Sequence, residues 1–336
     1  MRITHPISFK MSQIENGGEA MAYTAVDEDQ ATNLLKAAGL GVGDTGLRSM
    51  RLLDGGWANS NYLLTLEDNS QLVLKVWDER TPDEVEKVTA NTLWLADYGF
   101  PTPVPLMLEN GERMLVVDDQ GWMLIPYISG GWLPTDPASI FDLGCVLARL
   151  HAIPVSEEIP RTFAVGFDFW DELVSTAQRE GTFTPFLHLF QRESGELKKK
   201  IPTDLPRGIV HGDLFPDNVI GRTGEVLALL DFEEICVDYL AFDLMMTYVG
   251  FGWKDGLPVE ELWRELIDGY QSVRPLTSAE HAALPDLHRF AVVSVAAWRY
   301  WQFMINIPGT EHADRYLEMV DRLEIPLPIK GDERQI

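Results

Sequence analysis

Residues 209–220 read IVHGDLFPDNVI, and this stretch carries the clearest motif of the chain. An apolar pair leads into a His-Gly-Asp triplet that ends at Asp213, and Asn218 follows five positions later. Asp231 lies eighteen positions after Asp213, at the end of an apolar run. Phosphoryl transfer needs one carboxylate beside the attacking hydroxyl, and an amide oxygen and a second carboxylate that hold magnesium on the nucleotide. The spacing therefore predicts Asp213 as the catalytic residue and Asn218 and Asp231 as Mg²⁺ ligands.

This spacing resembles the catalytic loop of the aminoglycoside phosphotransferase and choline kinase superfamily, whose members have a protein-kinase-like fold. The resemblance is strongest over residues 209–243, and segment 214–219 is most similar to the bacterial type II homoserine kinases. The implied fold is α+β and bilobal. A small N-lobe with an antiparallel β-sheet would span residues 1–125, and a larger, mainly α-helical C-lobe would span residues 126–336.

The resemblance also implies two supporting residues. His211 is expected to pack under the loop and to hydrogen-bond its backbone. Asp243 is expected to tie the loop down by accepting backbone N–H bonds, so that its removal would leave buried donors unpaired. A role for Asp243 as the N-cap of the following helix is compatible with this expectation.

Composition indicates one large globular domain or two. The chain has 336 residues, of which 46% are hydrophobic, enough to bury a core. Cys145 and Cys236 lie in apolar contexts and are interpreted as reduced, buried thiols, not as a disulfide framework. The sequence shows no charged-then-apolar leader and no apolar run of 18 residues. A cytoplasmic protein without a membrane partner is expected.

The net charge of −25 argues against nonspecific binding to nucleic acid, whose phosphates would be repelled. It also means that a site for ATP must supply positive charge locally, from metal ions, basic side chains and backbone N–H groups.

The first part of the chain has the element order of a kinase N-lobe. Residues 1–24 are expected to be a tail or an added strand, and residues 25–40 a helix capped by Asp27 or Asp29. Alternating apolar residues predict strands at 50–53, 62–66 and 71–77.

The nucleotide site is expected around the turn before the second of these strands. Gly55 and Gly56 would let the backbone fold over the phosphates, with Asn59 and Ser60 in the same turn. Lys75 would reach the α- and β-phosphates as a point charge. A Gly-Gly pair is more often a simple turn and a strand lysine is more often solvated, but their order ahead of the catalytic loop favours the nucleotide role.

Residues 82–98 are predicted to form the helix whose glutamate pairs with the nucleotide lysine in kinases. Glu86 is the preferred partner of Lys75, and Glu84 is the alternative. The position implied by the resemblance falls near Val88, so the choice stays open. Both glutamates also suit an exposed acidic first turn of the helix.

Two further strands, 113–118 and 121–125, are predicted with Asp119 and Gln120 as the turn between them. The following segment looks like the hinge between lobes, where backbone groups of Pro126 and Ile128 would meet the adenine. Pro126 can offer only its carbonyl. A strand that runs into a glycine turn would have the same composition.

The C-lobe is predicted to be helical on both sides of the catalytic stretch. His151, at the end of the first helix, is interpreted as a core residue and not as a catalyst. The basic residues 198–200 are interpreted as a cation-rich helix end. The predicted helices are 136–152, most of 167–200, 260–270, 278–304 and 312–323.

Acidic and aromatic residues near the catalytic stretch are candidates for binding the phosphate acceptor. A cationic nitrogen on the acceptor could be bound by a carboxylate and by one aromatic ring, and an acceptor carboxylate could be bound by an arginine. The candidates are Glu233, Glu234, Asp238, Trp298, Tyr300 and, for the acceptor carboxylate, Arg299. A solvated acidic loop and an exposed helix arginine are the alternatives.

The sequence therefore predicts a phosphotransferase that uses ATP and Mg²⁺ to phosphorylate the hydroxyl of a small molecule, with homoserine as the best guess. Choline, ethanolamine or another amino alcohol, an aminoglycoside, or a degenerate fold acting as a binding module are the alternatives. A protein substrate is disfavoured because only ten residues separate Glu233 from Leu244, which leaves little platform for a peptide. The oligomeric state and the preference for ATP over GTP stay open.

Overall fold

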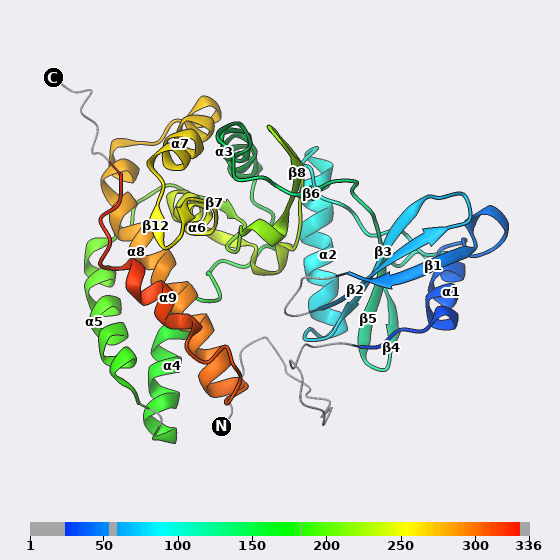
Figure 1. The fold of residues 1–336 in the computed structure, drawn as a ribbon, viewed down its shortest axis with the longest axis horizontal. Helices are drawn as coiled ribbons and strands as arrows, with labels where there is room; N and C mark the ends of the chain where they lie inside the picture. Colours follow the sequence, from blue (N-terminus) through cyan, green and yellow to red (C-terminus); the bar gives the residue numbers. More distant parts are fainter. Residues whose placement is uncertain (1–23, 54–58, 182, 330–336) are drawn as a thin grey trace. The chain divides into compact units, whose positions relative to one another are not determined.

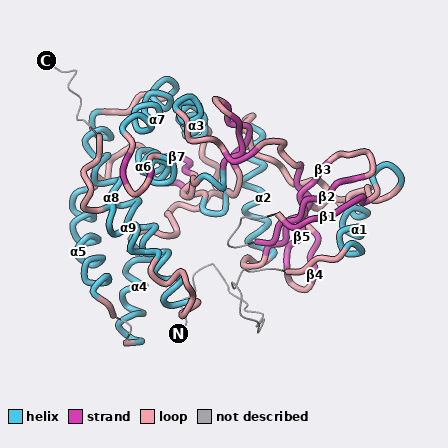
Figure 2. Tube along the Cα trace, viewed as in Figure 1, coloured by secondary structure: helices cyan, strands magenta, loops and turns pink. Residues whose placement is uncertain are grey.

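The structure is a computed structural model that describes residues 24–53, 59–181 and 183–329. The chain divides into two compact units. The first ends at Gly130 and also takes in Ala228–Leu230, and the second contains the remaining described residues. The last long strand of the first unit ends at Pro126, and the unit continues to Gly130, five residues past the boundary expected after residue 125. Figure 2 shows the long strands of the main sheet in the first unit and most helices in the second.

The first unit is built on an antiparallel sheet. Its strand order within the described residues is β1-β2-β3-β5-β4, so β3 lies at the centre. The predicted strand 71–77 is confirmed without change, whereas the strand predicted at 113–118 is shorter. The strands are β1 (Leu47–Leu52), β2 (Asn59–Leu66), β3 (Gln71–Trp77), β4 (Leu115–Val117) and β5 (Gln120–Pro126).

The turn between β4 and β5 lies one residue earlier than predicted. Val117 pairs with Gln120, so the two turn residues are Asp118 and Asp119. Both have left-handed backbone, with φ of 49° and 63°. Left-handed φ at both central positions is the type I′ geometry, whose twist matches that of a hairpin and which aspartate tolerates.

One helix covers each face of this sheet (Figure 1). Alternate residues of β3 point to opposite faces. Leu72, Leu74 and Val76 pack in the cluster that contains Leu34 of α1 (Glu28–Ala37), whereas Trp77 packs with Val85 of α2 (Pro82–Asp97). Lys75 shares the face of Trp77, which is the face that α2 covers.

The cap predicted for α1 is confirmed, and α2 begins and ends at residues typical of helix termini. Asp27 caps α1, and its side chain accepts a hydrogen bond from the backbone N–H of Gln30. Thr81 caps α2 in a reciprocal capping box with Glu84. Gly99, with φ of +73°, follows the end of α2 and provides the left-handed residue that commonly ends a helix.

The second unit is mainly helical. Its helices are α3 (Pro137–His151), α4 (Phe167–Glu180), α5 (Pro185–Lys200), α6 (Leu240–Phe251), α7 (Glu260–Val273), α8 (Ser278–Tyr300) and α9 (Arg315–Arg322). Its short strands are β6 (Gly131–Trp132), β7 (Arg207–Val210), β8 (Val219–Arg222), β9 (Glu225–Leu229), β10 (Cys236–Tyr239), β11 (Trp253–Lys254) and β12 (Leu257–Pro258).

Several predicted helices differ in extent. The helix predicted at 25–40 is shorter at both ends, and the one predicted at 260–270 continues to Val273. The segment 167–200 is two helices, because Gly181 adopts φ of +69° and ends α4. The helix predicted at 278–304 is α-helical only to Tyr300 and continues as a π-helix, Trp301–Asn306. The last helix is shorter than 312–323 at both ends.

Helices α3 and α7 cross closely because glycines lie at the crossing. A Cβ atom added to Gly144 would lie 2.7 Å from the backbone nitrogen of Tyr270, and one added to Gly269 would overlap the backbone of Phe141. Both positions therefore exclude larger residues. The close crossing brings His151, at the end of α3, beside Tyr270 of α7.

Within the part of the chain that the structure describes, no helix is both long enough and apolar enough to cross a membrane.

Candidate active site

Two pairs of strands hold the predicted catalytic residues at one place in the second unit. The strands β7 and β10 pair antiparallel, with Val210 opposite Cys236, so the loop after β7 lies beside the residues that precede β10. The strands β8 and β9 are neighbours in one sheet and follow each other directly. Asn218 precedes β8 and Asp231 follows β9, so both lie at the same end of this hairpin.

Gly212 is required because the loop after β7 lies very close to the segment that precedes β10. Its φ is +81°, a left-handed conformation that favours glycine. An added Cβ would also lie 2.9 Å from the carbonyl oxygen of Glu234 and 3.2 Å from the ring of Phe163. This contact places Glu233 and Glu234 next to the loop that carries Asp213.

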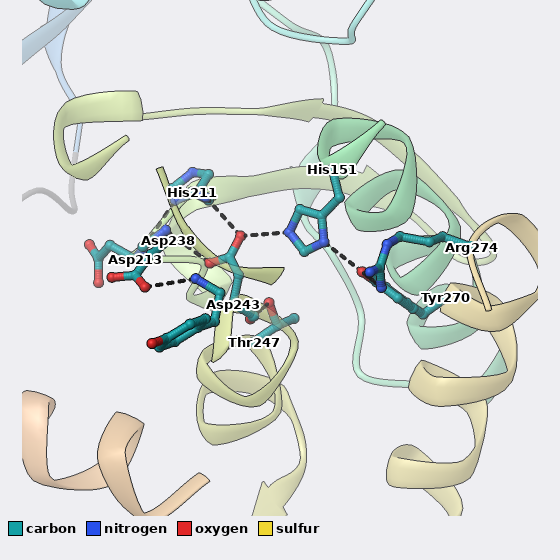
Figure 3. A network of polar contacts seen from close by, with 10 residues as sticks. His151, His211, Asp213, Asp238, Asp243, Thr247, Tyr270 and Arg274 are labelled. Atoms are coloured by element: carbon teal, nitrogen blue, oxygen red, sulfur yellow. Dashed lines mark hydrogen bonds and ion pairs between the residues drawn. The ribbon is translucent and has the colours of Figure 1, made fainter. Parts of the chain in front are cut away.

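Asp243, in the first turn of α6, holds the loop from behind, as expected (Figure 3). Its carboxylate accepts the backbone N–H of His211 at 2.7 Å and that of Gly212 at 2.9 Å. The side chain is fully buried, and burial raises the pKa of Asp243. The hydrogen bond from His151, the charge interactions with the nearby histidines and the backbone N–H donors outweigh burial and leave this pKa below its ordinary value. Asp243 is therefore an ionised, internal anchor for the loop.

His211 lies under the loop and is fully buried, and its Nδ1 accepts the backbone N–H of Asp213 at 3.3 Å. Its ring packs on Phe232 with centroids 4.6 Å apart. This placement agrees with the supporting role expected for it.

His151 is buried and also makes a polar contact through each of its ring nitrogens. Its Nε2 lies 3.1 Å from Asp243 Oδ2, and its Nδ1 lies 2.7 Å from the hydroxyl of Tyr270 (Figure 3). Arg274 donates to the same hydroxyl at 3.1 Å and to Glu280 at 2.9 Å.

One arrangement of protons satisfies this chain. If Nε2 of His151 carries the hydrogen, it donates to the carboxylate of Asp243, and Nδ1 accepts the hydroxyl hydrogen of Tyr270. The Tyr270 oxygen then accepts from Arg274. If Nδ1 of His151 carried the hydrogen instead, both His151 and Arg274 would donate to the Tyr270 oxygen. The hydroxyl hydrogen of Tyr270 would then have no acceptor in this chain of contacts. The geometry therefore favours a hydrogen on Nε2 of His151 that points at Asp243, and the chain of contacts links the predicted catalytic loop to the corner between α7 and α8.

Asp213 is exposed to solvent, whereas Asn218 is buried. The side-chain N–H of Asn218 donates to the backbone carbonyl of Asp213 at 2.8 Å and, more weakly, to its carboxylate at 3.4 Å. Asn218 therefore fixes the loop with its nitrogen, which leaves its amide oxygen as the atom that suits a cation.

The acidic surroundings affect Asp213 strongly. Partial desolvation by the surrounding protein, followed by the negative charges of Glu234, Asp217 and Glu233, raises its pKa to about 7. Water reaches this carboxyl directly, so the desolvation is weaker than that of a sealed core position. A cation bound among these carboxylates would lower the pKa again.

Asp231 has left-handed backbone, with φ of 61° and ψ of 62°. Non-glycine residues in this conformation concentrate at functional sites, where the surrounding structure holds them. Oxygen ligands such as this carboxylate and the Asn218 amide are those that Mg²⁺ takes. No group of three or more His, Cys, Asp or Glu side chains among the described residues forms a metal site alone. Mg²⁺ usually binds one or two carboxylates together with substrate phosphates, so the residues present fit a metal that arrives with a nucleotide.

The predicted nucleotide residues of the first unit are partly described. Lys75 is buried in the central strand, and its Nζ lies 3.8 Å from the centroid of the Trp77 ring. Asn59 is buried at the start of β2. Gly55 and Gly56 lie outside the described residues.

Ser60 makes structural contacts, and its contact with a nucleotide stays a prediction. It is fully buried, its hydroxyl donates to Asp78 at 2.6 Å, and it accepts the backbone N–H of Thr24 at 2.9 Å. A hydroxyl held in this way ties the chain before α1 to the sheet, which gives no support to a contact with nucleotide.

The choice of glutamate partner for Lys75 stays a prediction. Glu84 bonds to Thr81 in the capping box, and Glu86 is exposed, whereas Val85 and Val88 form the face of α2 that packs on the sheet. Neither glutamate is on that face.

The expected hinge residues differ in exposure. Pro126, the last residue of β5, is exposed, and Ile128 is half-buried. Their contact with an adenine is likewise still a prediction.

Several acceptor candidates are occupied by structural contacts. Asp238 accepts the backbone N–H of Tyr239 and lies 3.7 Å from Arg207. Arg299 donates to Glu318 at 2.8 Å and to the backbone of Arg315, so the role expected for it with an acceptor carboxylate receives no support.

The two aromatic candidates, Tyr300 and Trp298, differ in their burial and contacts. Tyr300 is buried, stacks on Phe186, and shares a hydrogen bond with Thr184, so it does not suit an acceptor. Trp298 is half-buried and remains a candidate.

Comparisons with known proteins agree with this geometry. Residues 49–276 match the model of a family described as a phosphotransferase enzyme family. A curated homoserine kinase of Rhodospirillum rubrum is 31% identical over 294 residues, which cover 85% of this chain and 89% of that protein. The predicted resemblance is thereby confirmed.

Solved structures share the fold. The amicoumacin kinase hAmiN in complex with AMP-PNP, Ca²⁺ and Ami has a TM-score of 0.67 at 17% identity, covering 90% of this chain and 96% of its own. A choline/ethanolamine kinase family protein from Mesorhizobium loti has a TM-score of 0.66 at 20% identity, covering 89% and 95%. These similarities confirm the predicted fold class.

Proposed function

We propose that this chain, which belongs to the phosphotransferase enzyme family, is a kinase that transfers the γ-phosphate of ATP to the hydroxyl of a small molecule and requires Mg²⁺. The observation that carries the proposal is the loop of residues 211–218. Its backbone is anchored by Asp243, its Asn218 is fixed by two contacts with Asp213, and the Asp213 carboxylate is open to solvent.

Each residue has a definite task in this proposal. Asp213 orients the acceptor hydroxyl and takes its proton as the oxygen attacks phosphorus. Asn218 and Asp231 hold Mg²⁺ through their side-chain oxygens, and Lys75 binds phosphate oxygens of the nucleotide. Bound Mg²⁺ would add to Lys75 in offsetting the charge of the phosphates within this acidic chain.

The acceptor that we propose is homoserine. The similarity to a curated homoserine kinase over 85% of the chain supports it. The negative charge that Glu233 and Glu234 place beside Asp213 also supports it, because homoserine carries an ammonium group near its hydroxyl.

An amino alcohol such as ethanolamine or choline is the second candidate. The observation in its favour is the pairing of Arg299 with Glu318, which removes the arginine expected to bind an amino-acid carboxylate. The same acidic residues would bind the cationic nitrogen of either class.

The test is ADP release by the purified chain with Mg²⁺ and ATP, measured with homoserine, ethanolamine, choline and kanamycin. We expect stimulation by homoserine, dependence on Mg²⁺, and loss of most turnover in Asp213→Asn, with ATP binding retained. Stimulation by ethanolamine or choline alone would move the proposal to the second candidate. Turnover close to normal in Asp213→Asn would refute the role of Asp213.

A further inference from the structure

The central strand β3 places a lysine and a tryptophan on the same face of the sheet. Lys75 and Trp77 are two residues apart, so their side chains leave the strand on the same side. The ammonium nitrogen Nζ of Lys75 lies over the Trp77 ring, 3.8 Å from its centroid. A cation is attracted to the face of an aromatic ring within about 6 Å of the centroid, so the two side chains form a close cation–π pair.

The pair is buried, which strengthens the attraction. Lys75 is 9% exposed and Trp77 is 4% exposed. A cation–π contact contributes more when it is shielded from water, because water then competes less for the ammonium group. The ring of Trp77 is therefore a substantial partner for the Lys75 ammonium.

The ring of Trp77 is itself held in place. Its indole N–H donates to the sulfur of Met123 at 3.3 Å, and Met123 lies opposite Lys75 in the neighbouring strand β5. Trp77 also packs in one buried cluster with Val85 and Val88 of α2. A ring fixed in this way presents one face to Lys75 and so defines where the ammonium group lies.

The helix α2 presents apolar residues where a kinase presents the glutamate that pairs with its nucleotide lysine. Val85 and Val88 belong to the face of α2 that packs on the sheet, and Val88 is the position that the resemblance implies for the glutamate. Glu84 is held in the capping box with Thr81, and Glu86 is exposed. Neither glutamate of α2 is therefore on the face that packs on the sheet.

We propose that Trp77 is the positioning residue for Lys75 and takes the role that kinases give to a glutamate. The inference rests on the function proposed above, in which Lys75 binds phosphate oxygens of the nucleotide. The ring attracts the ammonium group through its electron-rich face and adds no negative charge. In a chain with a net charge of −25, this neutral partner orients the lysine without cancelling the positive charge that attracts the phosphates.

The test measures binding of AMP-PNP with Mg²⁺ to the full chain by calorimetry, in the parent and in two variants of Trp77. Trp77→Leu removes the ring, and we expect AMP-PNP to bind about tenfold more weakly. Trp77→Phe keeps a smaller ring that attracts cations less strongly, and we expect a loss of only about threefold. A graded loss of this kind follows from the ring face and not from burial alone.

Trp122→Leu is the matched control. Trp122 is 2% exposed and lies in the neighbouring strand β5, but it packs on the opposite face of the sheet, in the cluster that contains Leu34. Both leucine variants remove the same atoms from the same sheet, so urea unfolding should show similar losses of stability. We expect Trp122→Leu to change AMP-PNP binding by less than about twofold.

A double-mutant cycle tests whether Trp77 acts through Lys75. Lys75→Met removes the ammonium group but keeps an unbranched side chain, and Trp77→Leu should then weaken the residual binding of AMP-PNP no further. The contact can also be observed without nucleotide. The ε-methylene protons of Lys75 should show an upfield NMR shift from the indole ring current, and Trp77→Leu should remove this shift.

Three results would overturn the role of Trp77. They are equal weakening of AMP-PNP binding by Trp77→Leu and Trp122→Leu, an equal effect of Trp77→Leu with and without Lys75, and the absence of an upfield shift at Lys75. No binding of AMP-PNP by the parent chain would instead refute the nucleotide site on which the inference rests. The experiment therefore distinguishes failure of the inference from failure of the proposed function.

Discussion

The hydroxyl of Tyr270 offers a sharp test of the network behind the catalytic loop. It is the link between His151 and Arg274, and the structure contains a second buried tyrosine for comparison. Tyr270 and Tyr248 are both fully buried. The hydroxyl of Tyr270 has two hydrogen-bond partners, whereas that of Tyr248 has none among the described residues.

The expected cost of Tyr270→Phe follows from what remains unpaired. The ring stays, so no cavity forms, but Nδ1 of His151 loses its donor inside the protein. An unsatisfied buried group costs about 1–3 kcal/mol. Arg274 keeps its bond to Glu280 and is partly exposed, so the loss of its bond to the Tyr270 hydroxyl adds little to the cost. We therefore expect the free energy of unfolding to fall by about 2 kcal/mol.

The assay is urea unfolding of both variants beside the parent, with the m-value used to check that the mode of unfolding is unchanged. Tyr248→Phe removes a hydroxyl without a partner, so its effect should stay within about 0.5 kcal/mol. Because the network ends on the loop backbone through Asp243, Tyr270→Phe should also lower kcat and leave the KM for ATP unchanged. Equal costs in the two variants, or a loss below about 0.5 kcal/mol for Tyr270→Phe, would refute the reasoning.

Two further predictions concern a glycine and a buried histidine. Gly212→Ala should lower the free energy of unfolding more than Gly256→Ala. Both glycines have left-handed φ, but only the new Cβ at Gly212 meets a backbone oxygen, that of Glu234. Equal unfolding free energies for the two variants would contradict this. Burial and then two nearby arginines lower the pKa of His288 to about 3, below its ordinary 6.5. The unfolded chain therefore binds this proton first, so stability falls by up to about 1.4 kcal/mol per unit as the pH drops from 6.5 toward 3. His288→Gln should flatten this dependence in urea unfolding between about pH 7 and pH 4, and an unchanged slope would count against it.

Local signals predicted the elements of the first unit well. The central strand, the capping residues of α1 and α2, and the glycine after α2 follow from short-range patterns that local geometry enforces. The turn before β5 was placed one residue late, because Asp119 and Gln120 suit a turn as well as Asp118 and Asp119 do. Only the pairing of Val117 with Gln120 distinguishes them.

Side-chain partners were predicted less well. Ser60, Arg299 and Tyr300 have the chemistry of ligand-binding residues, yet the structure gives each of them a structural partner. His151 was assigned to the core alone, although it bonds the residue that anchors the catalytic loop. The partners of such residues are distant in sequence, and no local pattern identifies them. The position of His151 at the end of α3 was a weak signal of such a contact, since a histidine at the end of an apolar helix face lies near the core.

The sequence alone was enough to predict the catalytic stretch, because the proposed base and the candidate metal ligands are identified by residue type and spacing over residues 213–231. It also determined the alternation that puts Lys75 on one face of its strand. Only the tertiary structure decided what holds the loop in place. The anchor Asp243, His151 and Tyr270 come from α6, α3 and α7, and a hydrogen bond depends on distances within about 3 Å that only the packed fold establishes.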